Sequence, residues 1–350
     1  MTLSHWDYLS ALQSHDFVLR TYTERHKRRP SARLIKQITA NFLQAQEYYN
    51  SARVAAASVK PLLLYYGISS LSRGIILSLD PRQHEDTLAA SHGLQPVRWK
   101  ETLHGEIKNL LELEVTACRG TFTELAAATR NKTEGWFHIG PYPSRVRFEK
   151  TQDISEITNG DIKIGLGDCL SWIKQLSKIY QSVMGIPSNV FSAQIFYIAA
   201  QNNIPKLQAD ISMFRIGDIN EADMRDVFRL STEIPILHRD GTNWIQVPAL
   251  WARITGGSES DLMAQMPTYD EDSGEVANVV RPIEGKYDIA PLLIMYLSAY
   301  ILGMIVRYFP SIWMALLRNE KGDQAQPLLL SAMKVIEEGF LNQALRFLGA

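Results

Sequence analysis

Cysteine is nearly absent from this 350-residue chain, which has only Cys118 and Cys169. Two cysteines build neither a disulfide framework nor a cysteine-rich zinc site, and such scarcity is typical of a reducing compartment. Charge of one sign is not in excess either, because 36 Lys and Arg residues face 37 Asp and Glu residues. This balance argues against a protein that mainly coats nucleic acid or an anionic membrane, although a local basic patch is compatible with it. The first residues lack the basic segment and apolar run of a signal peptide. We therefore expect a cytoplasmic protein.

Several signatures of catalysis are also missing. The chain has no G-x-x-x-x-G-K-[ST] phosphate loop and no G-x-S-x-G nucleophile elbow. Gly165-Leu166-Gly167 lacks the third glycine and the preceding strand of a dinucleotide-binding fingerprint. The eight histidines show no metal-ligand spacing with one another or with the cysteines. We therefore predict no metal site and no cofactor.

The apolar residues, 46% of the chain, recur at helical spacing in its first and last parts. After Ser31, which suits an N-cap, they recur every three or four positions up to Ala52 and predict a long helix. Pro61–Leu79 is apolar nearly all round and predicts a buried helix. Further helices are predicted at Glu101–Thr116, Thr123–Thr129, Gly165–Met184, Ala290–Tyr308, Ser311–Arg318 and Gln326–Leu348.

The middle of the chain has a different character. β-Branched and aromatic residues between turn signals predict strands within Val190–Ala199, Ala209–Ile216 and Trp244–Leu250, whereas the Gly- and Pro-rich Arg130–Ser144 predicts a loop. The predicted fold class is therefore α+β and predominantly helical. We expect a helical N-terminal part at 1–186, a strand-rich middle section at 187–287, and C-terminal helices at 288–350 that pack back on the N-terminal part.

One long run without charge needs an explanation. Ile289–Val306 has 18 uncharged residues, which reaches the lower limit for a transmembrane helix, but no strongly basic flank accompanies it. Pro61–Leu79 has a similar composition and contains one arginine, Arg73, in its C-terminal half, and Ile289–Val306 is followed directly by Arg307. Shared composition or an internal duplication explains this likeness. We expect two helices at the centre of a soluble core and no membrane, with a partner for each arginine, because an unpaired buried charge is unfavourable.

Three segments resemble a known family. They are SARVAAASVKPLLLYYGISSLSRGIILSLDP, the SHGL of Ser91–Leu94, and the C-terminal YLSAYILGMIVRYFPSIW. Together they resemble the YaaC-like family, bacterial proteins of about this length without an established biochemical activity. The resemblance supports the predicted fold and a cytoplasmic location. It implies no particular reaction, since none of its motifs is a known catalytic signature. The motif residues that carry it are Tyr66, Arg73, Gly93, Arg307, Tyr308 and Trp313.

A second resemblance is to HEPN-type helical domains. In ribonucleases of that type, an arginine and a nearby histidine act on the scissile phosphate in a dimer cleft. The matching residues here are Arg130, Asn131 and His138. Seven residues separate Arg130 from His138, more than that motif normally contains, and this departure puts the implied RNA-cleaving site in doubt.

His92 and Arg98 are the other candidate catalytic residues. Neutral imidazole is suited to general base catalysis near neutral pH, and guanidinium binds phosphate or carboxylate with paired hydrogen bonds. The structural alternative is that His92 braces a loop beside Gly93, and that His138 packs in an aromatic loop tip. Both alternatives stay open at this stage.

A basic run precedes Pro30. Arg25, Lys27, Arg28 and Arg29 are candidate nucleic-acid contacts, because Lys and Arg bind phosphates without regard to base sequence. A solvated connector between helices is the alternative for these four residues.

Two functions follow from these observations. The first is a non-catalytic interaction subunit, with another protein or a second copy as partner, in a stress- or phage-defence-type assembly. The defence context is an expectation from analogy. The second is a metal-independent HEPN-type ribonuclease that acts on RNA, with His92 or His138 as acid/base and Arg98 or Arg130 holding the phosphate.

Overall fold

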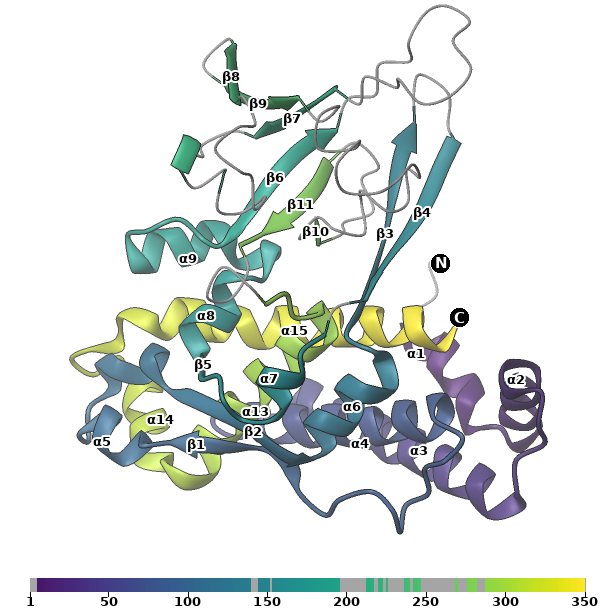
Figure 1. Cartoon of the computed structure of the whole chain (residues 1–350). Coiled ribbons are helices and arrows are strands. Elements are labelled where there is room, and N and C mark those ends of the chain that lie inside the picture. Colours follow the sequence, from purple (N-terminus) through teal and green to yellow (C-terminus); the bar gives the residue numbers. More distant parts are fainter. Residues whose placement is uncertain are drawn as a thin grey trace, which may run out of the picture. The chain divides into compact units, whose positions relative to one another are not determined.

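The computed structural model describes residues 5–139, 144–151, 153–195, 212–216, 220–222, 225, 236–239, 242–246, 268–269, 276–281 and 287–349. The chain divides into two compact units (Figure 1). Unit 1 comprises Met1–Asn131, Ile154–Pro187 and Pro291–Ala350, and unit 2 comprises Lys132–Asp153 and Ser188–Ala290. Helices dominate unit 1, and antiparallel strands dominate the described part of unit 2. The prediction of a predominantly helical α+β protein is confirmed.

Unit 1 combines helices with one small sheet. Its strands β1 (His92–Val97), β2 (Glu114–Gly120) and β5 (Ile164–Gly165) form an antiparallel sheet in the order β1-β2-β5. Its helices are α1 (His5–Leu9), α2 (His15–His26), α3 (Ala32–Val54), α4 (Lys60–Leu79), α5 (Trp99–Leu103), α6 (Thr121–Thr129), α7 (Ser155–Thr158), α8 (Leu166–Ser171), α9 (Ser177–Met184), α13 (Pro291–Tyr308), α14 (Pro310–Leu317) and α15 (Gln326–Leu348).

The long helix predicted after Ser31 is α3. Its N-cap is Ser31, whose Oγ accepts a hydrogen bond from the backbone N of Leu34 at 3.1 Å. The apolar face of α3 packs along α4. Glycine makes this close approach feasible, because a Cβ on Gly67 of α4 would lie only 2.7 Å from the ring of Tyr49.

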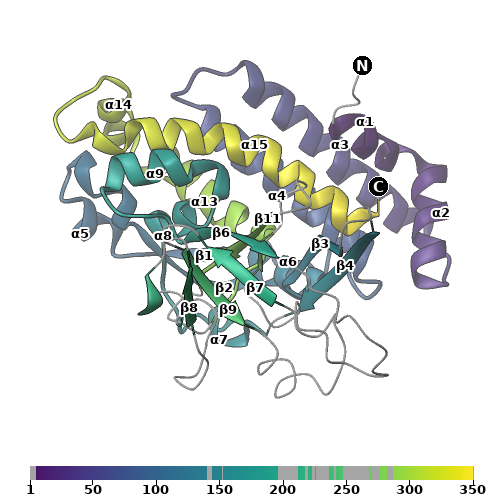
Figure 2. The same ribbon diagram turned by 90° about the horizontal axis from the view of Figure 1, so that it is seen from above.

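Helix α13 lies at the centre of unit 1, and every residue from Pro291 to Val306 is buried. It packs against α4, where a Cβ on Gly303 would lie 2.8 Å from Cβ of Tyr65. Helix α15 contacts both α13 and α4 (Figure 2). By length and composition α4 and α13 both qualify as membrane spans, but a core helix passes the same test, and most of each is buried against other parts of unit 1.

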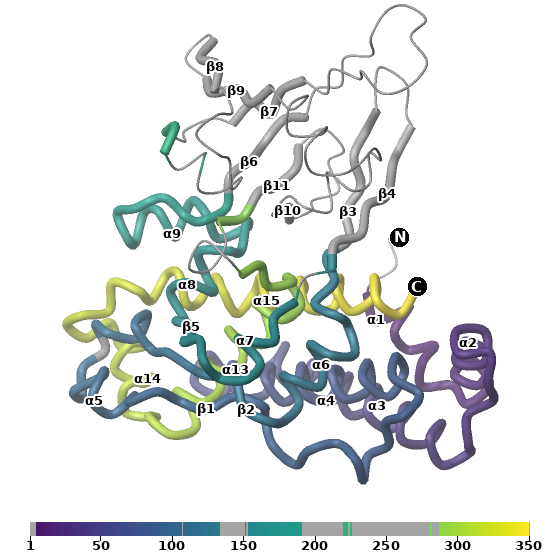
Figure 3. Tube along the Cα trace, viewed as in Figure 1, coloured from purple at the N-terminus to yellow at the C-terminus, as the bar shows by residue number. Residues whose placement is uncertain are grey.

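The C-terminal helices α13, α14 and α15 follow one another within unit 1 (Figure 3). Trp313 of α14 joins them to the other end of the sequence, because its Nε1 donates a hydrogen bond to the backbone O of Ala57 at 2.9 Å. Ala57 lies in the turn between α3 and α4. The family motif at the end of α13 therefore packs against the beginning of α4.

Two predicted helices are wrong in extent. The helix predicted at Glu101–Thr116 ends at Leu103, because His104 (φ 46°) and Gly105 (φ 75°) adopt the left-handed conformation that terminates helices. The chain then forms a 3-10 turn and strand β2. The helix predicted at Gly165–Met184 is divided into α8 and α9 by a second 3-10 turn.

Two predicted loops contain strands. His92 was expected in a loop, but it begins β1, which pairs with β2 through a β-bulge between His92 and Leu94. The segment Arg130–Ser144 contains β3 (Lys132–Ile139), which pairs with β4 (Ser144–Thr151). Both loop predictions relied on glycine and proline as loop residues, and both are wrong because a strand tolerates these residues at bulges and edges.

Unit 2 contains a second antiparallel sheet in its described part. The three predicted strands overlap β6 (Val190–Ile195), β7 (Ser212–Ile216) and β9 (Thr242–Gln246). The other strands are β8 (Ile236–Arg239), β10 (Thr268–Tyr269) and β11 (Val276–Val280), and the order is β10-β11-β6-β7-β9-β8.

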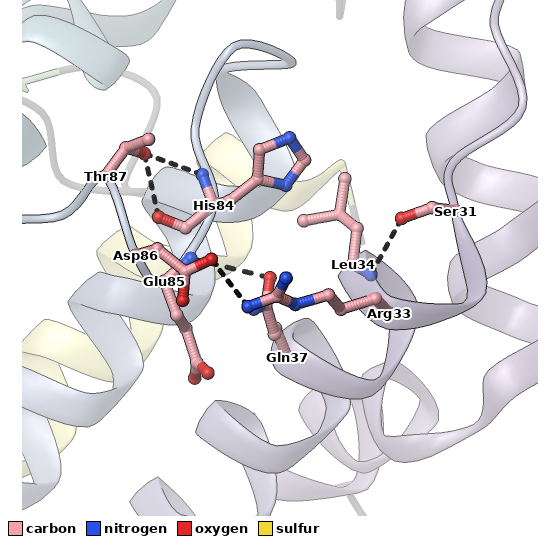
Figure 4. A network of polar contacts seen from close by, with 8 residues as sticks. All are labelled: Ser31, Arg33, Leu34, Gln37, His84, Glu85, Asp86 and Thr87. Atoms are coloured by element: carbon pink, nitrogen blue, oxygen red, sulfur yellow. Dashed lines mark hydrogen bonds and ion pairs between the residues drawn. The ribbon is translucent and has the colours of Figure 1, made fainter.

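The segment that leads from α4 to β1 is tied to the beginning of α3 (Figure 4). Arg33 of α3 forms an ion pair with Asp86, and the backbone N of Glu85 donates to Oε1 of Gln37 at 3.5 Å. These contacts fix the segment between α4 and β1, which ends at His92, the first residue of β1.

Candidate functional site

The three segments that carry the family resemblance meet in unit 1. Tyr65 and Tyr66 come from α4, His92 begins β1, and Arg307 lies in the last turn of α13. Oη of Tyr65 lies 2.6 Å from Nδ1 of His92. Nη1 of Arg307 donates to Oη of Tyr66 at 3.1 Å. We refer to these four residues as the candidate site.

Gly93 positions His92 in this site. Its φ is 80°, a conformation that L side chains rarely adopt, and a Cβ would lie 2.5 Å from the backbone N of Phe122. The backbone O of Ser91 accepts a hydrogen bond from the backbone N of Thr121 at 3.0 Å. The SHGL motif is therefore the point where β1 crosses close to the beginning of α6.

Two tyrosines of α13, one helical turn apart, hold β1 in place. Oη of Tyr296 donates to the backbone O of His92 at 2.9 Å, and Oη of Tyr300 donates to the backbone O of Leu94 at 3.1 Å. The rings of Tyr65 and Tyr300 lie 5.3 Å and 5.7 Å from the imidazole. Packed aromatic side chains thus fix both the backbone and the ring of His92.

The hydrogen bonds assign a tautomer to His92. The single phenolic proton of Tyr296 is engaged by the carbonyl of His92. Tyr65 contacts Nδ1 of His92 at 2.6 Å and Oη of Tyr296 at only 3.5 Å, and from the shorter distance we infer that Tyr65 donates its proton to Nδ1. Nδ1 is then an acceptor, and the neutral imidazole has its proton on Nε2.

Electrostatics keep this histidine neutral. Burial, together with the positive charge of Arg307, lowers the pKa of His92 below its usual value of 6.5. Burial raises the pKa of Tyr65 and of Tyr300, and it raises the pKa of Tyr296 to about 12. At neutral pH the site therefore contains a neutral imidazole and the protonated phenol of Tyr65.

The two arginines of the apolar helices have polar partners rather than ionic ones. Nη1 of Arg73 donates to the backbone O of Ala89 at 3.5 Å, and Arg307 donates to Tyr66. Arg307 is exposed, and its guanidinium lies 5.1 Å from the ring centre of Tyr308. Within the described ranges, no carboxylate lies within 4.0 Å of either guanidinium.

The other candidate catalytic residues lie elsewhere. Arg98 precedes α5 with φ 49° and is exposed, and six residues of extended chain at about 3.3 Å each separate it from His92. Arg130 is exposed and ends α6 with φ 56°. The backbone of His138 lies in β3 of unit 2, opposite Arg145, and its side chain is outside what the structure describes. Neither Arg98 nor Arg130 contacts His92 in the part of the chain that is described.

The basic run is partly structural. Nη2 of Arg25 donates to two backbone carbonyl oxygens at the end of α15, at 3.1 and 3.0 Å, and so caps that helix. Lys27 ends α2 in the left-handed conformation. Arg28 and Arg29 are exposed. Only part of the run is thus available to a nucleic acid.

The described residues contain no group of three or more His, Cys, Asp or Glu side chains that are arranged to hold a metal ion. Cys118 and Cys169 are both free thiols, and burial raises the pKa of Cys169. A thiol kept protonated in this way is a packing residue rather than a nucleophile.

Sequence reasoning missed three residues of this region, Tyr65, Tyr296 and Tyr300. The available signal was the spacing of Tyr296 and Tyr300 at i and i+4 on a helix without charge. A buried phenol needs a hydrogen-bond partner, and two of them on one face indicate a polar element packed against that face.

The fold and the site define a predominantly helical α+β protein with a histidine–tyrosine–arginine cluster at the junction of α4, α13 and β1. A family model described as YaaC-like Protein matches residues 8–348, and the chain belongs to this family. The first resemblance is thereby confirmed, over more of the chain than the three segments that suggested it. No curated protein and no solved structure matches the chain significantly.

Proposed function

We propose that this member of the YaaC-like family is a non-catalytic interaction subunit of the bacterial cytoplasm, working in a stress- or phage-defence-type assembly. The contact of 2.6 Å between Tyr65 and His92 carries the proposal. A general base needs an unprotonated nitrogen that faces the substrate. In His92 the unprotonated nitrogen faces Tyr65, and the other nitrogen already holds its proton. The histidine therefore serves as a hydrogen-bond donor.

Exposed apolar side chains at the turn between α3 and α4 support an interaction role. Val54 and Val59 flank this turn with 85% and 46% of their surface exposed, and Tyr308 at the end of α13 is 58% exposed. The hydrogen bond from Trp313 to Ala57 joins the turn to α14. Apolar side chains that are exposed in this way gain from being covered by a partner.

Self-association can be tested with the purified protein alone. If a second copy covers this surface, sedimentation velocity shows association that increases with concentration and weakens in Tyr308→Ser. Tyr8→Ser is the matched control, because Tyr8 is 47% exposed on α1. A chain that stays monomeric at every concentration excludes the second copy and assigns the surface to a different protein.

A HEPN-type ribonuclease is the second candidate. The observation that favours it is that the positive charge of Arg307 helps to lower the pKa of His92. An acid/base group and a cation that can bind phosphate then belong to one site. The arginine involved is Arg307 rather than Arg98 or Arg130. In this mechanism His92 would act in its doubly protonated form, in which the imidazolium gives its Nε2 proton to the leaving oxygen and returns to the neutral ring.

Incubation of the purified protein with total RNA and EDTA separates the two functions. The interaction subunit leaves the RNA intact. Cleavage by the native chain that is abolished in both His92→Ala and Arg307→Ala would replace the proposal with the nuclease. Cleavage that survives both substitutions would point to a contaminating enzyme.

A further inference from the structure

We propose that Arg307, His92 and Tyr66 form a binding site for one phosphate-class oxyanion, namely inorganic phosphate or the phosphoryl group of a phosphomonoester. This site goes beyond the proposed interaction role and shares with it only the tautomer inferred for His92.

Arg307 has free hydrogen-bonding capacity. A guanidinium has five N–H donors in a planar fork, and one of them is engaged by Tyr66 at 3.1 Å. The side chain is exposed, and no carboxylate forms an ion pair with it within the part of the chain that is described. An arginine of this kind suits a phosphate, whose oxygens accept paired hydrogen bonds from the fork.

His92 adds a second type of donor. Its Nδ1 accepts from Tyr65, so Nε2 holds a proton for which no acceptor is found among the described residues. This N–H is not among the buried polar atoms that lack a partner, so it is open to solvent and can donate to a bound oxyanion instead of to water. Tyr66 accepts from Arg307 with its oxygen, which leaves its own proton free for the same ligand.

The elements that hold these donors are adjacent, because α13 packs on α4 and its tyrosines bond to β1. Tyr300 and Arg307 are seven residues apart, which is two turns on one face of α13. Tyr300 packs on the imidazole of His92 at 5.7 Å. On α4, the rings of Tyr65 and Tyr66 lie 5.8 Å apart, one bonded to His92 and the other to Arg307.

The groups that face the site favour an anion. The side chains that contact His92 and Arg307 are the phenols of Tyr65, Tyr66, Tyr300 and Tyr308, from α4 and α13, and no carboxylate is among them in the part of the chain that the structure describes. A tetrahedral phosphate offers oxygens in several directions to donors from these different elements. A carboxylate offers two oxygens in one plane and can use fewer of them, so we expect it to bind more weakly.

Isothermal titration calorimetry with inorganic phosphate, adenosine 5′-monophosphate and acetate, at constant ionic strength, tests this site. We expect saturable binding of phosphate or of the monophosphate, with an affinity at least tenfold weaker in Arg307→Gln. Arg307→Lys keeps the charge without the fork and should lie in between. Arg20→Gln is the matched control, because Arg20 is also an exposed arginine, stacked on Phe17 at 5.2 Å.

A second readout is the pKa of His92, followed by NMR during the phosphate titration. A bound anion favours the imidazolium, so the pKa should rise in phosphate but not in chloride of equal ionic strength. The proposal is overturned by the absence of saturable binding to either phosphate ligand, by an equal loss in Arg20→Gln, or by acetate binding as tightly as phosphate. A purely structural role of Arg307 would leave the pKa of His92 insensitive to phosphate, which also contradicts the proposal.

Discussion

The phenol of Tyr65, on α4, and the imidazole of His92, on β1, form a hydrogen bond of 2.6 Å between residues that are 27 positions apart in the sequence. This bond joins the central helices of unit 1 to the edge of its small sheet. The direction of this bond decides which nitrogen of His92 holds the proton, and the chemistry of the candidate site depends on that nitrogen.

Removal of the Tyr65 hydroxyl should destabilise the protein. In Tyr65→Phe the half-buried Nδ1 of His92 loses its donor, and an unsatisfied polar atom of this kind costs about 1–3 kcal/mol. Urea unfolding followed by circular dichroism measures the difference. Tyr8→Phe, at an exposed tyrosine, should leave the free energy of unfolding unchanged. Equal stability of Tyr65→Phe and the native protein would contradict the proposed bond.

Stability should decrease in mildly acidic solution because of His92. Its pKa in the folded protein is below the usual 6.5, so the unfolded chain binds more protons as the pH falls through that value. The free energy of unfolding therefore drops between about pH 7 and the pKa of the folded state, and it levels off below that pKa. His92→Asn retains an acceptor for Tyr65 and should show a smaller drop.

The measurement is a series of urea unfolding curves from about pH 7.5 to about pH 5. His15→Asn, at an exposed histidine, controls for the loss of one histidine. If native protein and His92→Asn lose stability in parallel over this range, the neutral state assigned to His92 is wrong.

Gly93→Ala should be strongly destabilising. A Cβ at this position combines a positive φ of 80° with a distance of 2.5 Å to the backbone N of Phe122, and backbone atoms cannot move aside easily. We expect a loss of more than about 2 kcal/mol, or failure to fold. Gly105→Ala is the matched control, because Gly105 has φ 75° but no atom within 4 Å of a Cβ. It should lose only about 1 kcal/mol in thermal or urea unfolding.

The buried ion pair between α4 and α15 should also contribute to the stability of the protein. Nζ of Lys60 on α4 lies 2.7 Å from Oε2 of Glu337 on α15, and the side chains are only 17% and 10% exposed. Glu337→Gln leaves the ammonium without its counter-charge and should cost about 3 kcal/mol in urea unfolding. Glu106→Gln, in the exposed pair with Lys108, should have no measurable effect. Similar results for the two variants would show that Lys60 is solvated.

The helices at the two ends of the sequence were predictable because their determinants are local. Ser31 marks the beginning of α3, because its side chain caps the helix. The apolar residues within α4, α13 and α15 recur at helical spacing over many turns. The strand β1 was not predictable in the same way. Gly93 and Pro96 are typical of a loop, and only pairing with β2, whose partner residues lie 17 (Val97 with Glu114) to 28 (His92 with Gly120) positions further on, makes the segment a strand.

Three of the four members of the candidate site were predictable, but Tyr65 and the arrangement of the four residues were not. His92 and Arg307 stood out as a rare histidine and as a charge in an apolar helix. Their association requires α13 to pack on α4 across more than 200 residues of sequence, through contacts such as the one from Tyr296 to His92. No local pattern encodes a contact of that range, so sequence reasoning paired His92 with its neighbour Arg98 instead.

The tautomer of His92 tests the central claim most directly. Long-range ¹H–¹⁵N NMR on protein labelled with ¹⁵N-histidine distinguishes the two nitrogens, and His92→Asn identifies the signals. At pH 7 we predict a neutral ring with its proton on Nε2 and an unprotonated Nδ1 that accepts from Tyr65. A proton on Nδ1, with Nε2 free as a base, would contradict the assignment of His92 as a hydrogen-bond donor and would favour catalysis.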